Sequence, residues 1–421
     1  MIHSTKDMRR GGERDIIAGL DIGTSKIGVV IGEVAEAGGI QILGTGMSPS
    51  EGLRQGVVIN LNLAVQSIER AVQEAQLTAG IEIEDVIVGI AGDHIRSVNS
   101  RGVVAVSRSD HEITQHDVNR VIDAAKAIAL PIDREVLHII PQEFIVDNQS
   151  GIKDPVGISG VRLEAEVHIV TGAVTSAQNI VRSVNKAGLG VIALVLEPLA
   201  SSYAVLDKNE KDLGVALVDV GGGTTDIALF YDGEIRNTVV IGLGGQNVTN
   251  DIALGLRTPP MEAEAIKKKY GCCYKAMVSK DEMFMVPGLG GRPPTEVSRM
   301  LLTTIIQPRM EEIFSLASKE IKRSEFCNLL GAGVVLTGGG SLLEGSLELA
   351  EEIFGFPAKF GIPQGFTGLV ESVSTPIFAT GAGLVLYGLK HAGEIEKQYG
   401  EEEGLFSKIL HWMRHFVENF F

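Results

Sequence analysis

Two aspartates, Asp21 and Asp219, are each followed by a turn of small residues that is suited to binding phosphate. Glycine in such a turn lets backbone N–H groups approach a phosphate closely, because no Cβ atom is in the way. The carboxylates would hold Mg²⁺ and its water molecules rather than the anionic phosphates. We therefore predict two phosphate-binding turns, each with one metal-proximal aspartate. The turn residues are Gly23, Thr24, Ser25 and Lys26 after the first aspartate, and Gly221, Gly222, Gly223 and Thr224 after the second.

Apolar stretches flank these turns. The first turn is followed by Ile27–Ile31, and the second lies between Leu217–Val220 and Ile227–Phe230. An apolar strand, a tight turn and another apolar strand form the pattern of a β-hairpin. Two such hairpins, each able to open its own domain, predict a phosphate chain held between two similar domains. The alternative is a pair of ordinary glycine-rich hairpins in a large α/β protein.

The overall composition limits the class of protein. A chain of 421 residues is long enough for several domains with their own cores. Its formal net charge of −16 argues against a nucleic-acid partner, which needs clustered Lys and Arg. The cysteines, Cys272, Cys273 and Cys327, suggest a reduced, cytosolic protein without a zinc site. Residues 1–15 lack an apolar signal-peptide core and are expected to be a disordered arm, and no stretch is long enough to span a membrane.

A third glycine turn follows the apolar run Val334–Thr337 and precedes a helix expected over 342–354. Backbone N–H groups and a helix N-terminus at such a turn suit an adenosine or phosphate edge, although a purely structural turn fits the same residues. The sequence contains neither a complete P-loop nor a complete dinucleotide fingerprint. The residues of this turn are Gly338, Gly339, Gly340 and Ser341.

Three charged residues are further candidates. Glu197 precedes Pro198 at the start of an expected helix, where it can orient a water molecule or simply favour the helix dipole. Glu264 and Lys267 are three positions apart on one expected helix, and this spacing alone predicts an ordinary surface ion pair. Local sequence therefore leaves the role of all three open.

Changes in polarity and in the expected secondary structure along the chain predict its domains. Asn60 is expected to cap a helix that ends at Gly80, and the polar stretch 92–168 contains a helix that begins at Thr114. The expected ranges are 16–91 with 169–210 and 375–390 for the first lobe, 92–168 for an inserted domain, 211–250 with 328–374 for the second lobe, 251–327 for a helical subdomain, and 391–403 for an acidic linker.

The last segment, 404–421, has the pattern of an amphipathic helix. Its apolar residues fall on one helical face, and Trp412 lies near the boundary of that face. A short amphipathic helix behind a polar tether favours a helix that lies on a membrane surface, while docking on protein is the alternative. The apolar residues are Leu405, Phe406, Ile409, Leu410, Met413, Phe416, Val417, Phe420 and Phe421.

Together these features resemble the actin-like ATPase superfamily and, within it, the FtsA family of bacterial cell division. The resemblance covers nearly the whole chain from Ile16 to Phe421. It implies an α/β protein with an actin-like ATPase fold of two related lobes, a small inserted α/β domain and the terminal helix. It rests on the stretches 19–26, 136–144, 151–157, 217–227, 258–260, 290–294 and 336–341 and on the terminal helix.

The resemblance also implies ATP with Mg²⁺ between the lobes. Both hairpin turns would meet the phosphates, with Asp21 and Asp219 near the metal. Glu264 and Lys267 would contact adenosine and ribose, and the turn 338–341 would take the adenine side. Glu197 would orient the attacking water, although not every member of the family carries an acid there. Gly244, Gly245 and Asn247 would form a further phosphate-edge loop.

The partners that the resemblance implies complete the prediction. Members polymerise into actin-like protofilaments that residues 405–421 would tether to the cytoplasmic face of the membrane. They recruit the division GTPase FtsZ through the region that corresponds to 251–327, and later division proteins through the region that corresponds to 92–168. The alternatives are a small-molecule kinase of the same superfamily, or another actin-like scaffold such as MreB or a pilus-assembly ATPase.

Overall fold

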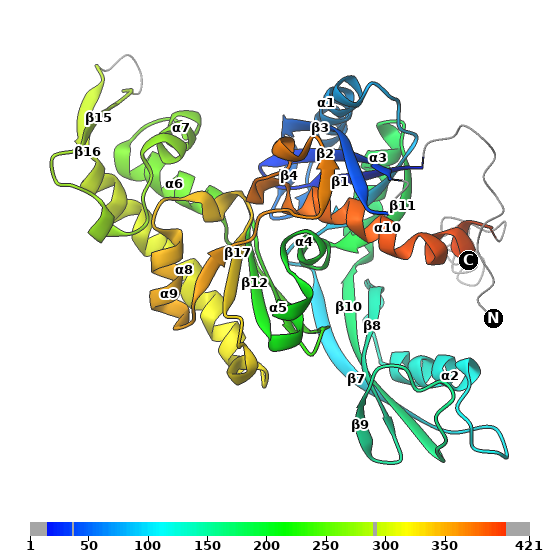
Figure 1. Ribbon diagram of the computed structural model, residues 1–421. Coiled ribbons are helices and arrows are strands. Elements are labelled where there is room, and N and C mark those ends of the chain that lie inside the picture. The colour runs from blue at the N-terminus through cyan, green and yellow to red at the C-terminus, as the bar shows by residue number, and fades with distance from the viewer. Residues whose placement is uncertain (1–14, 36–37, 289–292, 401–421) are drawn as a thin grey trace.

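The computed structural model describes residues 15–35, 38–288 and 293–400. Figure 1 shows two lobes that lie side by side and a smaller domain below them. The predicted arm 1–15, apart from Asp15, and the predicted membrane helix 404–421 lie outside the described residues. Among the helices that are described, none is long and apolar enough to cross a membrane.

The first lobe is built on a sheet in the order β11-β6-β1-β2-β3-β19. The first hairpin and the next strand form an antiparallel meander, while β6 and β11 continue from β1 in parallel. Near-continuous runs of apolar residues and glycine bury both faces of the central strands. The strands are β1 (Ile16–Ile22), β2 (Lys26–Val34), β3 (Ile40–Pro49), β6 (Asp85–Ile90), β11 (Gly190–Leu196) and β19 (Phe366–Gly368).

The second lobe repeats this arrangement in the order β14-β13-β12-β17-β18. The second hairpin is again followed by an antiparallel strand, and two parallel strands extend from the other side of β12. Five strands of the two sheets therefore correspond one to one, as expected for related domains. The strands are β12 (Val215–Val220), β13 (Thr225–Tyr231), β14 (Glu234–Ile241), β17 (Val334–Thr337) and β18 (Ala358–Phe360).

Helices cover these sheets and join the lobes. As predicted, the Asn60 side chain caps α1 (Leu61–Ala79) by accepting from the N–H groups of Asn62 and Leu63. Two further helices, α4 (Glu197–Val205) and α10 (Ala379–Gly400), pack so closely that a Cβ on Gly383 would lie 2.0 Å from the Ala200 carbonyl oxygen. The remaining helices of this region are α3 (Val174–Lys186) and α5 (Lys208–Leu213).

A mainly helical region stands on the second lobe, at the left of Figure 1. Its core includes the fully buried Phe314 on the longest helix and Phe354 on α9, whose rings lie 5.6 Å apart. It also contains a short antiparallel hairpin that the sequence reading did not anticipate. The elements are α6 (Gly245–Leu256), α7 (Pro260–Tyr270), β15 (Met283–Val286), β16 (Thr295–Ser298), α8 (Arg299–Arg323) and α9 (Ser346–Phe354).

The inserted domain is a sheet in the order β7-β10-β8-β9 with one helix packed on it. The helix begins with the predicted capping box, in which the Thr114 N–H donates to the Asp117 carboxylate over 3.1 Å. The domain has its own buried cluster, centred on β10. Its elements are β7 (Arg96–Ala105), α2 (Gln115–Lys126), β8 (Arg134–Val146), β9 (Gln149–Ile152) and β10 (Arg162–Ala173).

Five expected boundaries differ from the observed elements. Residues 391–400 continue α10 instead of forming a linker, because Glu, Lys and Gln favour a helix once the preceding turns exist. The strand β19 joins the first sheet, although 328–374 was assigned to the second lobe. The borders at 168 and 250 fall inside β10 and α6. After the third turn, a 3₁₀ turn over 339–342 precedes α9, so the helix starts at Ser346 and not at 342.

Short elements complete the fold. The strands β4 (Leu53–Arg54) and β5 (Val57–Val58) pair with each other close to the first hairpin. The 3₁₀ turns are η1 (Lys275–Met277), η2 (Cys327–Leu329), η3 (Gly339–Leu342), η4 (Val370–Ser372) and η5 (Pro376–Phe378).

Candidate functional site

The first hairpin carries a charge pair at its turn. Asp21 lies on β1 opposite Gly28 of β2, and the Lys26 ammonium forms an ion pair with the Asp21 carboxylate. The hydroxyl of Thr24 accepts a hydrogen bond from the Gly56 N–H over 3.0 Å, which ties the turn to the neighbouring loop. Lys26 is therefore directed at a carboxylate of its own hairpin.

The second hairpin carries two acids and no cation. Asp219 of β12 lies opposite Asp226 of β13, and both side chains are buried. Asp219 accepts a hydrogen bond of 3.0 Å from the Ser201 hydroxyl of α4, and Asp226 accepts one of 2.9 Å from the Thr224 hydroxyl. The Gly221 N–H closes the turn on the Thr224 carbonyl over 2.9 Å.

The tips of the two hairpins meet across the lobes. A Cβ on Gly222 would lie 2.0 Å from the Ser25 Oγ, and one on Gly223 would lie 2.5 Å from the Thr24 Oγ1. Only glycine fits at these two positions while the lobes keep this arrangement, because the clash involves Cβ atoms of the facing residues as well. The structure thus brings together both turns that the sequence predicted, from segments far apart in the chain.

The N-terminus of α6 is bonded to the second turn. The N–H groups of Gly245 and Gln246 donate to the carbonyls of Gly221 and Gly222 over 2.9 and 2.8 Å. The predicted loop residue Asn247 caps its own helix, because its side chain accepts from the Gly244 N–H over 3.0 Å. These contacts place the 244–247 loop directly beside the second predicted phosphate-binding turn.

Glu264 and Lys267 are more than a surface pair. The Lys267 ammonium lies 2.6 Å from the Glu264 carboxylate and donates to the Gly245 carbonyl and the Thr249 hydroxyl over 3.0 and 2.8 Å. Burial lowers the pKa of Lys267, while its partner Glu264 acts in the opposite direction. The pair therefore joins α7 to the start of α6, at the edge of the predicted nucleotide site.

The third turn packs against the second hairpin. Gly338 has a φ of +81°, and a Cβ there would lie 2.2 Å from the Asp219 Oδ1. A Cβ on Gly340 would lie 2.6 Å from the Val220 Cγ1, so backbone approaches backbone at both positions. Ser341 is fully buried, and its hydroxyl donates to the Gly338 carbonyl over 2.7 Å. The Ser341 hydroxyl thus donates its proton to a hydrogen bond within the turn.

Four acids gather behind the hairpin tips. Burial and the neighbouring Asp21 raise the pKa of Asp219 to about 6, despite the Ser201 hydrogen bond. Burial and Asp219 raise the pKa of Asp226, whose Oδ1 is buried without a hydrogen-bond partner. Burial and the three aspartates raise the pKa of Glu197 well above its usual range. Lys26 opposes these shifts at Asp219 and Glu197.

This excess of buried acid fits a hydrated cation. A cation would remove the repulsion that raises these pKa values, and its water could donate to the orphaned Oδ1 of Asp226. Within the described residues, no three acidic, histidine or cysteine side chains converge as direct metal ligands. The carboxylates present suit a metal that is held through its water molecules, as the sequence predicts for Asp21 and Asp219.

Asp226 is the site residue that the sequence reading missed. Its position in the second hairpin was visible, but only the strand register places it opposite Asp219. The length of the turn is the sequence feature that could have revealed this pairing. A four-residue turn between the paired residues Val220 and Thr225 places Asp226 opposite Asp219. Ser201 and Thr380, 3.1 Å apart, extend the network to α10 and carried no sequence signal of their own.

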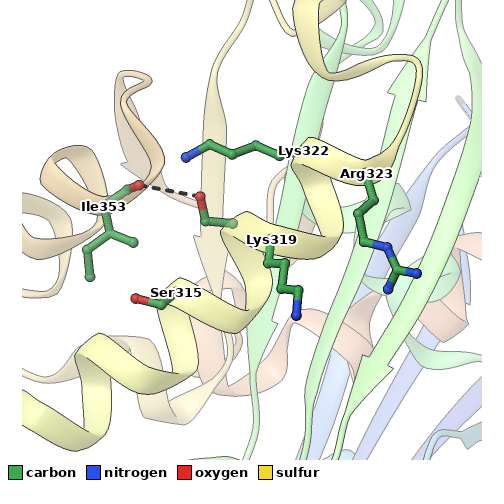
Figure 2. A pocket seen from close by; sticks show the side chains of 6 residues that line it. Ser315, Lys319, Lys322, Arg323 and Ile353 are labelled. Atoms are coloured by element: carbon green, nitrogen blue, oxygen red, sulfur yellow. Dashed lines mark hydrogen bonds between the residues drawn. The ribbon is translucent and has the colours of Figure 1, made fainter.

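Two hollows of the described structure lie away from the hairpins. Figure 2 shows one of about 410 Å³ between α8 and α9, where Ser318 Oγ donates to the Ile353 carbonyl over 3.4 Å. Its basic side chains Lys319, Lys322 and Arg323 point in different directions and do not converge on one point. The other, of about 360 Å³, lies between the inserted domain and the β13–β14 turn.

Two sheets of matching topology, crossing helices and facing acidic hairpins define an actin-like ATPase fold. Solved structures confirm this class. The PilM–PilN type IV pilus biogenesis complex matches with a TM-score of 0.66 at 18% identity, over 89% of this chain and 98% of that chain. MreB5 of Spiroplasma citri bound to ADP matches with 0.55 at 14%, over 90% and 98%. Likeness at such low identity concerns the fold alone.

Sequence relatives then give the particular family. The cell division protein FtsA of Pseudomonas aeruginosa is 51% identical over 89% of both chains. FtsA of Neisseria meningitidis is 45% identical over 96% of this chain and 98% of its own, and FtsA of Escherichia coli is 40% identical over 97% and 99%. The family model for cell division protein FtsA matches 216–383, and that for the SHS2 domain inserted in FtsA matches 92–171. The chain belongs to the FtsA family of cell division proteins.

Membership decides between the alternatives that the sequence left open. The predicted family, fold class and inserted domain are confirmed. The interpretation as an MreB-like or pilus-assembly scaffold is wrong, since those proteins share the fold at 14–18% identity and not the family. The kinase alternative fails for the same reason, because 97% of the chain aligns with a division protein.

Proposed function

We propose that this division protein binds ATP with Mg²⁺ at the two facing hairpins. The observation that carries the proposal is the contact between the two tips, with four acids and one lysine directly behind them. The turn N–H groups and the hydroxyls of Thr24 and Ser25 hold the phosphates. Asp21 and Asp219 hold the waters of the metal. Resident Mg²⁺ supplies positive charge to the phosphates and to the acids.

Glu197 orients the attacking water in this proposal. Its carboxyl lies against Gly89 of β6, where a Cβ would approach the Glu197 Cγ to 3.1 Å. Burial and the neighbouring aspartates raise the pKa of Glu197, which disfavours the ionised form that a general base needs, and a cation that neutralises those aspartates would act in the opposite direction. These features support slow hydrolysis that depends on the metal.

The nucleoside end occupies the opposite side of the second hairpin. Lys267 and Glu264 contact the ribose and adenosine, and the turn 338–341 lies along the adenine. Support comes from the Lys267 bonds to the Gly245 carbonyl and to Thr249, which hold the pair beside the phosphate-edge loop. Gly340 reaches the same loop, because its Cα lies 3.7 Å from the Cβ position of Gly245.

We further propose that the protein forms actin-like filaments on the cytoplasmic face of the membrane at the division site. Residues 405–421 supply the membrane helix, and polymerisation multiplies its weak single affinity. FtsZ binds through the helical region 251–327, and later division proteins bind through 92–168. Family membership, the actin-like fold and the amphipathic pattern support this role.

The nucleotide proposal is tested by calorimetric titration with ATP and Mg²⁺. Wild-type protein should bind, and Asp219→Ala combined with Gly222→Val should abolish the binding. Asp123→Ala is the matched control, because that aspartate pairs only with Lys126 on the exposed face of α2. Unchanged ATP binding in the double variant would show that the nucleotide site is elsewhere.

The membrane proposal is tested with Trp412, the only tryptophan of the chain. Vesicles containing anionic lipid should shift its emission to the blue, and ATP should strengthen that shift. Deletion of 405–421 should abolish co-sedimentation with the vesicles. Emission that is blue already and indifferent to vesicles would mean that the helix is docked on protein.

A further inference from the structure

The corresponding outer edges of the two sheets differ in whether a further strand pairs with them. In the first sheet, β3 is followed at the edge by the short parallel strand β19. In the second sheet, β14 is the last strand, and no strand of the described residues pairs with its outer side. An unpaired edge leaves backbone groups that need other partners. The inserted domain supplies them from β7 and β8.

Side chains of the inserted domain take the place of a strand along β14. The Gln142 amide donates to the carbonyls of Ile235 and Arg236 over 2.8 and 3.1 Å. The Asn99 amide donates to the Arg236 carbonyl over 3.1 Å, and the Ser97 hydroxyl donates to the Thr238 carbonyl over 2.8 Å. We call Ser97, Asn99, Gln142 and His168 the β14 clasp.

His168 connects the members of the clasp. Its side chain is fully buried, with Nδ1 2.7 Å from the Asn99 Oδ1 and Nε2 2.9 Å from the Thr238 Oγ1. Since an amide oxygen only accepts, Nδ1 carries the proton, and Nε2 accepts from the Thr238 hydroxyl. Burial lowers the pKa of His168 to about 4, which keeps this neutral form at pH 7. A buried network of this kind is stable only when it is complete.

The clasped strand runs directly into the predicted nucleotide site. β14 ends at Ile241, and the next carbonyl, that of Gly242, accepts from the Gln55 amide of the first lobe over 2.7 Å. The Leu243 carbonyl accepts from the Thr225 hydroxyl over 2.9 Å. The N–H groups of Gly245 and Gln246 then reach the second turn. From Thr238 to the start of this loop at Gly242 is a span of about 13 Å along the strand.

We propose that the inserted domain controls the position of the 242–247 loop through the β14 clasp, so that events on that domain and at the nucleotide site affect each other. Asn99, Gln142 and His168 are positioning residues for this loop. The coupling is reciprocal, because a link between two equilibria acts with equal strength in both directions. The inference rests on the proposed nucleotide site for its consequence, but the mechanical link is independent of it.

The test compares two double variants of equal chemistry. Asn99→Ala with Gln142→Ala opens the clasp, whereas Gln115→Ala with Asn119→Ala removes an exposed Gln–Asn pair, 3.1 Å apart, from α2 of the same domain. Ser97→Ala removes only one hydrogen bond of the clasp. This milder variant replaces the double variant in the comparison if the double variant does not fold. Amide hydrogen exchange of nucleotide-free protein is followed in 232–241 and 242–250.

The clasp variants should exchange faster in both segments, by about threefold or more in 242–250, whereas the α2 control should match the wild type. Faster exchange that stays within 232–241 overturns the proposal, and so does an equal change in the control. In protein that binds ATP, the clasp double variant should also weaken the affinity about fivefold or more. If the wild type does not bind ATP, the proposed function is wrong. The hydrogen-exchange result would still decide whether the β14 clasp links the inserted domain to the 242–247 loop.

Discussion

The two hairpins share one backbone design and differ in charge. In each, a four-residue turn separates the paired strands, and the aspartate precedes that turn. The first turn ends in Lys26, which pairs with Asp21, and glycine stands opposite that aspartate. The second ends in Thr224, and the residue opposite Asp219 is a second acid, Asp226. The first hairpin therefore balances its charge, and the second does not.

This difference in charge indicates that the two hairpins have different roles. The repeated backbone pattern supports the proposal of two phosphate-binding turns, whereas the unequal charge favours a position of the proposed cation close to the second hairpin. The tips are also complementary in size, since hydroxyl side chains on the first face bare glycines on the second. A repeat that was symmetrical in sequence would clash at the tips.

The largest expected effect comes from disturbing this complementarity. Gly222→Ala places a Cβ 2.0 Å from the Ser25 Oγ and should weaken ATP binding about 100-fold, as it forces the turns apart. Adding Ser25→Gly removes the facing side chain and should recover about tenfold of that loss. Titration calorimetry measures both. Because Ser25→Gly also removes a hydroxyl that is proposed to hold phosphate, Ser25→Gly alone is measured as well. If the two single losses simply multiply in the double variant, the tips do not have to meet.

The next effect tests the balanced charge of the first hairpin. Lys26→Met leaves Asp21 buried without its cation and should lower the free energy of unfolding by about 1–3 kcal/mol in nucleotide-free protein. Lys126→Met is the control, because its partner Asp123 is exposed, and it should cost less than about 0.5 kcal/mol. Urea denaturation at pH 8 compares them. Equal losses would contradict the buried role of Lys26.

A smaller effect tests the unbalanced charge of the second hairpin through pH. Because the folded pKa of Asp219 is raised to about 6 and that of Asp226 is also raised, the folded state holds protons that the unfolded state releases. Their contribution to stability is complete below about pH 4 and is lost as the pH rises through about 6 for Asp219 and about 8 for Asp226. Asp226→Asn should flatten this decline and stabilise the apo protein by about 1–2 kcal/mol at pH 8.

Thermal unfolding from pH 5 to 8 measures that slope, with Asp123→Asn as the exposed control. The same Asp226→Asn change should weaken binding of Mg²⁺ with ATP, because the cation loses a carboxylate. If the stability of the Asp226→Asn variant falls with pH as steeply as that of the wild type, the proton that the folded state retains is held by another acid of the cluster.

Local chemistry explains what the sequence could predict. Asp, Gly and Thr in a short turn leave the backbone few alternatives, so both hairpins were predictable, and so was the cap at Asn60. The role of Asp226 was not, because it depends on a cross-strand register that only the folded hairpin defines. The same reason hides Ser201, which reaches Asp219 from another element.

Elements that depend on distant partners were also missed. The strand β19 is three residues long and exists because β3 offers an edge. The β15–β16 hairpin has four residues a strand, too few for a clear alternation. In 391–400, charge suggested a linker, although the same residues are good helix formers that continue from α10. Sequence pattern is strongest where structure is local, and the site lies between lobes.

The smallest effect concerns the support that the first turn receives. The Thr24 hydroxyl accepts from the Gly56 N–H over 3.0 Å, whereas in the second turn the Thr224 hydroxyl donates to an acid. Thr24→Val removes that acceptor and should cost about 0.5–1.5 kcal/mol of stability without nucleotide. Thr24→Ser keeps the hydroxyl and should stay within about 0.5 kcal/mol of the wild type. If valine and serine behave alike in thermal unfolding, the bond to Gly56 contributes nothing, and the hydroxyl would be left to serve phosphate alone.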